Sequence, residues 1–80
     1  MSVKKSLLMN KQQICKLIRE IRFETGLTQE QFAAQLGITY STINRWENGK
    51  SKPSPLALQK IEQLLEQMGK EELLAKYLAD

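Results

Sequence analysis

The sequence has no histidine, and its single aspartate is the C-terminal Asp80. Histidine is the most frequent general acid and base and a common zinc ligand, so histidine triads and cysteine–histidine zinc sites are excluded. The single cysteine, Cys15, cannot form an intramolecular disulfide, and beside an apolar helix face it is interpreted as an inert thiol. No glycine-rich loop follows a strand pattern, so nothing supports nucleotide binding. We therefore predict a protein that is not an enzyme and uses no cofactor or metal.

Long hydrophobic runs are missing as well. Near the N-terminus only residues 7–9 form an apolar stretch after Lys4 and Lys5, which is too short for a signal-peptide core. No run approaches the roughly 18 apolar residues that span a bilayer. We therefore expect a cytoplasmic protein with no membrane partner, and 80 residues suffice for one small domain.

Positive charge is concentrated in one part of the chain. Residues 1–53 carry nine basic and four acidic groups, whereas residues 54–80 carry three and five. The first part therefore has a net charge of +5 and the second of −2. A basic part next to an acidic one is typical of a nucleic-acid binder with one docking side.

Apolar residues recur at helical spacing, and strand-like alternation is absent, so the sequence predicts an all-α fold: a compact bundle of five short helices. The predicted ranges are about 11–24, 28–36, 39–47, 55–68 and 70–78. The first helix buries one face, Ile14, Leu17, Ile18 and Ile21. The fourth begins at Ser54-Pro55 and buries a stripe of five residues, Leu58, Ile61, Leu64, Leu65 and Met68.

Two capped helix starts lie unusually close together between Thr28 and Gly49. Thr28 is the expected N-cap of the second helix, where Gln31 completes a capping box, and Thr39 is the expected N-cap of the third. Gly37 lies where the tight turn requires a positive φ. The pairs Leu27–Phe32 and Ile38–Ile43 are placed to form hydrophobic staples at the two helix starts. Ala33 is small where the two helices are expected to cross closely. This layout is the helix-turn-helix of DNA-binding proteins.

The same segment resembles the lambda repressor/Cro-like helix-turn-helix domains, the xenobiotic response element family. The closest stretches are GLTQEQFAAQLGI, STINRWENGK and KPSP, within a resemblance that runs from about Ile14 to Leu65. The resemblance implies a bundle of four or five helices whose third helix enters the major groove. It also implies that Gln29 contacts a phosphate and that Arg22 and Glu47 form a structural ion pair.

A helix in the major groove contacts bases through its N-terminal residues and one turn further along. The predicted base-reading residues are Thr39, Tyr40, Ser41 and Arg45. Arg45 is the strongest candidate because its planar fork can bond guanine at two acceptors. The alternative for Arg45 is a phosphate contact or a solvated charge. Trp46, on the inward face, is interpreted as a core residue and not as a base-stacking platform.

Contacts to the DNA backbone are expected from the start of the second helix and from the loop after the third. The predicted residues are Thr28, Gln29, Asn44, Asn48, Lys50 and Lys52. Asn44 lies where it could reach either bases or backbone. The loop from Asn48 to Lys52 is also expected to offer its backbone amides.

The leading function is a sequence-specific DNA-binding transcriptional regulator, a repressor, which binds a two-fold symmetric double-stranded operator as a homodimer. The alternative is an antitoxin whose main partner is a toxin or another protein, with autoregulatory DNA binding secondary. A third possibility is a DNA-targeting domain of a larger protein.

Both ends of the chain leave alternatives open. Residues 1–10 are predicted to be a basic arm, either unstructured or placing Lys4 and Lys5 on phosphates. The central domain is predicted at 11–69. The segment 70–80 either completes the core or dimerises through part of its apolar face with Leu65 or Met68. That face consists of Leu73, Leu74, Tyr77 and Leu78, and it would also be the docking face for a toxin.

Overall fold

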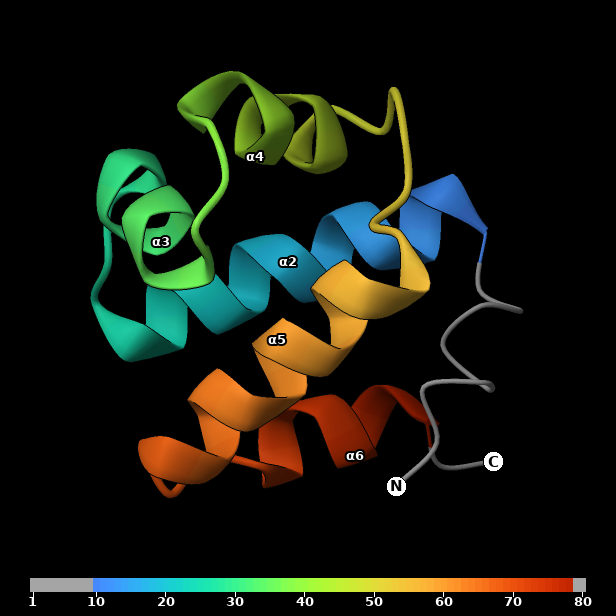
Figure 1. Cartoon of the computed structure of the whole chain (residues 1–80). Helices are drawn as coiled ribbons and strands as arrows, with labels where there is room; N and C mark the ends of the chain where they lie inside the picture. The colour runs from blue at the N-terminus through green and yellow to red at the C-terminus, as the bar shows by residue number, and fades with distance from the viewer. Residues whose placement is uncertain (1–9, 79–80) are drawn as a thin grey trace.

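The computed structural model describes residues 10–78, and side chains as far as Ala75. Within this part of the chain it contains helices and no strands, so the predicted all-α class is confirmed. The helices are α2 (Lys11–Thr25), α3 (Gln29–Leu36), α4 (Tyr40–Glu47), α5 (Pro55–Gln67) and α6 (Glu72–Leu78). In Figure 1, α2 runs through the middle of the molecule, with α3 and α4 on one side and α6 on the other. The helix-turn-helix is thus held at one end of the bundle.

The helix starts follow from side-chain capping. The Thr28 hydroxyl accepts a hydrogen bond from the Gln31 backbone amide at 3.0 Å, and the Gln31 side-chain oxygen accepts one from the Thr28 amide, which confirms the predicted capping box. Thr39 caps α4, also as predicted. Asn10, the last residue of the predicted arm, forms a second capping box with Gln13 at the start of α2. The remainder of that arm, with Lys4 and Lys5, lies outside the described residues.

The turn between α3 and α4 takes the predicted form. Gly37 has a φ of +69°, and the amide of Ile38 donates to the Ala33 carbonyl at 3.0 Å. This arrangement satisfies carbonyls in the last turn of α3 and ends that helix two residues before the N-cap of α4. Ile38 then packs partly against the core, and Ile43 is completely buried.

One core couples the five helices of the described residues. It contains the predicted face of α2, the predicted stripe of α5 except Met68, and Phe32, Ala33, Ile43 and Trp46 from the helix-turn-helix. Trp46 is 3% exposed, so its prediction as a core residue is confirmed. Met68, which the stripe on α5 was expected to bury, is 38% exposed. That prediction is wrong because α5 ends at Gln67, and the chain leaves the helix direction through Met68 and Gly69.

The C-terminal helix α6 packs against α2 and α5. Leu74 is 1% exposed within the core, and Leu73 is partly buried beside it. Leu65 is completely buried in the same core, which leaves it no surface for a subunit contact. The side chains of Tyr77 and Leu78 lie outside the described residues.

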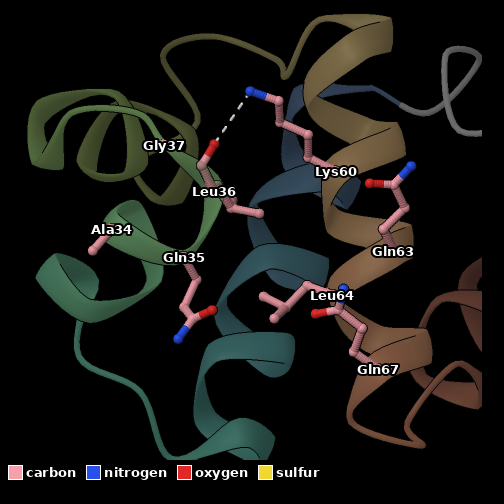
Figure 2. A pocket seen from close by; sticks show the side chains of 8 residues that line it. All are labelled: Ala34, Gln35, Leu36, Gly37, Lys60, Gln63, Leu64 and Gln67. Atoms are coloured by element: carbon pink, nitrogen blue, oxygen red, sulfur yellow. Dashed lines mark hydrogen bonds between the residues drawn. The ribbon is translucent and has the colours of Figure 1, made fainter.

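A second connection fixes the helix-turn-helix to α5. Lys60 extends from α5 to the carbonyl of Leu36, at 3.5 Å, as Figure 2 shows. A cation here compensates the partial negative charge at the end of α3. The lysine borders a groove of about 370 Å³ between α3 and α5 whose other walls include Gln35, Gln63 and Gln67. The turn is therefore supported from behind by α5.

Candidate nucleic-acid interface

The first turn of α4 presents a row of hydroxyl groups. Thr39, Tyr40 and Ser41 are exposed, Tyr40 by 50%. The Thr39 hydroxyl lies 3.2 Å from that of Ser41 and 2.9 Å from that of Thr42. Because each hydroxyl can donate and accept, this cluster can adapt to either kind of group on a base edge. Thr42 was not among the predicted residues, although its position three residues after the cap identifies it as a partner of Thr39.

Arg45 follows one turn later on the same exposed face. Its guanidinium makes no hydrogen bond or ion pair with any other residue of the described chain, and the side chain is exposed. Five donors in a planar fork are therefore available to an external acceptor. On the opposite face of the helix, Ile43 and Trp46 are fixed in the core. The helix thus combines an immobilised inner face with an outer face on which the Tyr40 and Arg45 side chains have no hydrogen-bond partner within the described chain.

The start of α3 lies next to that outer face. A cleft of about 450 Å³ is lined by residues from α2, α3 and α4, namely Arg22, Thr28, Gln29, Glu30 and Tyr40. The N-terminus of a helix carries a partial positive charge that favours an anion. The cleft therefore brings the predicted phosphate-contacting end of α3 and the predicted base-reading turn of α4 onto one surface.

Gln29 is less free than the sequence implied. Its side-chain nitrogen donates to Glu47 Oε1 at 3.0 Å, and its oxygen accepts from Asn44 Nδ2 at 3.4 Å. One N–H of Gln29 remains for a phosphate. The Thr28 hydroxyl is likewise committed to the cap. Both side chains therefore serve mainly to hold the start of α3 in place, and only part of their hydrogen-bonding capacity is left for DNA.

An ion pair sets the position of α4 against α2. Arg22 Nε donates to Glu47 Oε2 at 2.6 Å and Arg22 Nη2 to Oε1 at 3.1 Å, while Glu47 is 3% exposed. The hydrogen bond to Glu47 raises the pKa of Arg22, and burial opposes this with a smaller effect. Cys15 adds a further link, because its thiol donates to the Glu47 carbonyl at 2.6 Å. A desolvated pair of this kind fixes geometry more than it adds net stability.

The loop after α4 supplies side chains but few backbone amides. The amides of Asn48, Gly49 and Lys50 donate to carbonyls of α4, that of Lys50 to Arg45 at 2.9 Å. Gly49 adopts the predicted positive φ, +70°, which makes this helix end possible. The expectation that the whole loop offers its amides to a phosphate is therefore wrong for these three residues. The side chains of Asn48, Lys50 and Lys52 are exposed.

The described chain has no other obvious site. Among residues 10–78, no three cysteine or acidic side chains gather where they could hold a metal ion. Within the same range, no helix combines the length and the apolar character needed to cross a membrane.

Comparison with known proteins agrees with this geometry. The sequence pattern of the helix-turn-helix family matches residues 18–78. The chain is also 45% identical over 49 residues to a protein of Methanothermobacter thermautotrophicus named as an uncharacterized HTH-type transcriptional regulator, a match that covers 61% of this chain and 71% of that protein. No solved structure matches the chain. The chain, whose described residues form an all-helical bundle, belongs to the helix-turn-helix family of the lambda repressor/Cro-like, xenobiotic response element type.

Proposed function

We propose that this protein is a DNA-binding transcriptional regulator that represses its target by reading the major groove with α4. The observation that carries the proposal is the two-sided construction of α4. Its inner face is anchored through Ile43, Trp46 and Glu47, and its outer face presents Tyr40, Ser41 and Arg45 without partners in the core. A rigid helix with unengaged polar groups is what direct readout requires.

The contacts divide by chemistry. Arg45 is proposed to bond guanine, and the hydroxyl cluster of Thr39, Tyr40 and Ser41 to contact neighbouring base edges, including a thymine methyl. Phosphate contacts are proposed for Thr28 and Gln29 at the start of α3. Further phosphate contacts are proposed for the loop residues Lys50 and Lys52, with Asn44 and Asn48 beside them. Phosphate contacts place the protein in register, whereas base contacts select the sequence. No step of this mechanism requires a catalytic group.

A symmetric operator fits the size of the interface. One module of this size buries too little surface for tight, selective binding, so we propose that two copies occupy half-sites related by a two-fold axis. Function on a chromosomal operator requires the protein to be in the cytoplasm of its host. Occlusion of a promoter by such a dimer would repress transcription.

The apolar surface that could bind a toxin, as the antitoxin alternative requires, is smaller than the sequence suggested. It relies on the apolar side of α6, but Leu74 belongs to the core of the monomer. Leu73 is partly buried as well. The geometry therefore favours the regulator.

The direct test is selection of binding sites. The full-length protein is mixed with random double-stranded DNA of about 25 base pairs, and retained sequences are read after several rounds. We expect a two-fold symmetric consensus whose half-sites are about one helical turn, roughly 34 Å, apart. The measured affinity for the consensus should exceed that for scrambled DNA by at least about a thousandfold. Retention without any sequence preference would contradict the proposed function.

A further inference from the structure

The last four carbonyls of α4 all have hydrogen-bond donors, but one of these donors comes from another helix. An α-helix leaves its last four carbonyls without partners inside the helix. Those of Asn44, Arg45 and Trp46 accept from backbone amides of the residues that follow α4, at 3.0, 2.9 and 3.1 Å. The fourth carbonyl, that of Glu47, accepts from the thiol of Cys15 on α2 at 2.6 Å. The end of α4 is therefore completed by α2.

The carbonyl of Glu47 lies where it needs this donor. Glu47 is 3% exposed, so bulk water has little access to its backbone. A buried carbonyl that loses its partner bears the full cost of its lost hydration. A thiol is a weak donor, but it is the one that the described chain places at this carbonyl.

Cys15 holds a different part of Glu47 from the part that the ion pair holds. Arg22 and Gln29 bind the carboxylate, which ends a side chain with three rotatable bonds. Rotation about those bonds would let the backbone shift beneath a fixed carboxylate. The thiol acts on the backbone itself. Because Cys15 lies two turns before Arg22 on α2, one helix holds Glu47 by both its carbonyl and its carboxylate.

The backbone of Glu47 leads directly into the loop that is proposed to contact phosphates. Asn48 follows it, and the amide of Lys50 turns back to the Arg45 carbonyl. The side chain of Lys50 is exposed. A displacement of the Glu47 peptide therefore changes where this loop meets DNA. Because phosphates are present in every sequence, such a displacement weakens binding to all DNA.

We propose that Cys15 is a positioning residue for DNA binding, whose thiol fixes the backbone at the end of α4 and so places the loop that carries Lys50. This inference rests on the proposed DNA-binding function and adds to it a residue that does not contact DNA. Cys15 acts through Glu47, and the property that matters is its hydrogen-bond donor.

The variants Cys15→Val and Cys15→Thr form a matched pair, because both side chains are branched at Cβ and have nearly the same shape. Threonine keeps a hydroxyl donor, whereas valine places a methyl group against the carbonyl. Both are made in the full-length protein, with Gln12→Ala on the exposed side of α2 as the control. Fluorescence anisotropy measures their affinities for the selected operator and for scrambled DNA, at a temperature where circular dichroism shows every variant folded.

We expect Cys15→Val to bind both duplexes at least about threefold more weakly than Cys15→Thr, with a shallower salt dependence, because fewer phosphates are then neutralised. Cys15→Thr and Gln12→Ala should stay within about twofold of the parent protein. Equal affinities of Cys15→Val and Cys15→Thr would overturn the proposal. A loss confined to the selected operator would overturn it as well, since the effect would then concern base recognition and not the loop.

Nuclear magnetic resonance of the free protein distinguishes failure of this inference from failure of the proposed function. A hydrogen bond to a carbonyl changes the signals of its carbon and of the next amide, here the Glu47 carbon and the Asn48 amide. Cys15→Val should shift both signals, and Cys15→Thr should keep them near those of the parent. Signals that do not differ between the two variants would disprove the bond whether or not DNA is bound. If the bond is present but the parent selects no DNA, the proposed function fails, and the role of Cys15 in DNA binding fails with it.

Discussion

At the scale of single residues, the interface separates groups that are committed to the protein from groups that remain available. The Thr28 hydroxyl caps α3 and the Gln29 side-chain oxygen accepts from Asn44, whereas the guanidinium of Arg45 has no partner in the described chain. An unengaged cation loses little by meeting DNA, because no internal bond has to be broken first. Arg45 is accordingly the residue whose loss should change specificity most.

We expect Arg45→Ala to weaken binding to the selected operator by roughly 1–3 kcal/mol while leaving binding to random DNA almost unchanged. The reason is that a bidentate bond to guanine exists only on the cognate sequence. Fluorescence anisotropy with labelled operator and scrambled duplexes measures both affinities. Arg45→Lys keeps the charge without the fork and should lose most of the same discrimination. Equal losses on both duplexes would make Arg45 a phosphate contact.

At the scale of helices, most of the architecture could be predicted because its signals are local. A cap is a side chain and an amide three residues apart, and Thr28, Thr39 and Ser54 all cap the helices expected of them. The exposure of Met68 was not predictable, since helical periodicity alone does not say where the packing partners of α5 end. The hydrogen bonds of Gln29 with Asn44 and Glu47 could not be predicted for a similar reason. They join residues 15 and 18 positions apart, and only the folded crossing of α3 and α4 brings these residues together.

The turn between α3 and α4 offers a test at this scale. Gly37→Ala should lower the free energy of unfolding by roughly 1–2 kcal/mol, because Gly37 has a φ of +69° and a side chain is strained there. Crowding should add little, since the closest atom to an added Cβ is the flexible end of Lys60 at 3.9 Å. Gly37→Asn is the matched control and should lose less, as asparagine tolerates this conformation. Urea unfolding followed by circular dichroism measures both. A loss in Gly37→Asn as large as that in Gly37→Ala would contradict this explanation.

At the scale of the whole molecule, charge is distributed so that one side is suited to DNA. The exposed cations Arg45, Lys50 and Lys52 follow one another on α4 and its loop, whereas residues 54–80 carry five of the nine acidic residues and only three basic ones. Such a distribution orients the protein as it approaches a polyanion. It also makes the affinity dependent on ionic strength.

Affinity for DNA should therefore fall steeply with salt. The slope of log affinity against log salt is expected to be about −0.9 for each phosphate neutralised. Titration of a labelled duplex at several salt concentrations measures it, and Lys50→Ala should make the slope shallower by about one unit per subunit. Gln35→Ala, on the groove behind the turn, should leave the slope unchanged. A slope near zero for the parent protein would show that the basic part of the chain does not face the DNA.

The last expectation concerns the role of α6 in holding the molecule together. Leu74 is 1% exposed where α6 packs on α2 and α5, so removal of its side chain opens a cavity beneath the two long helices. Leu74→Ala should lower the free energy of unfolding by about 2–5 kcal/mol. Truncation after Gly69 removes the same side chain together with its helix and should lower the melting temperature at least as much. Met68→Ser, at a surface position, should change stability little.

Sedimentation of Met68→Ser, of Leu73→Ser and of the truncated protein distinguishes a core role of α6 from a subunit contact. If α6 serves the core alone, Met68→Ser and Leu73→Ser should leave the oligomeric state and operator affinity unchanged. If its outer side also joins two copies, these substitutions should yield a stable monomer with weak half-site binding, because each recognition helix would then bind alone. A truncated protein as stable as the full chain would contradict the placement of Leu74 in the core. In that case α6 would also not help to hold α2 in position beneath the recognition helix.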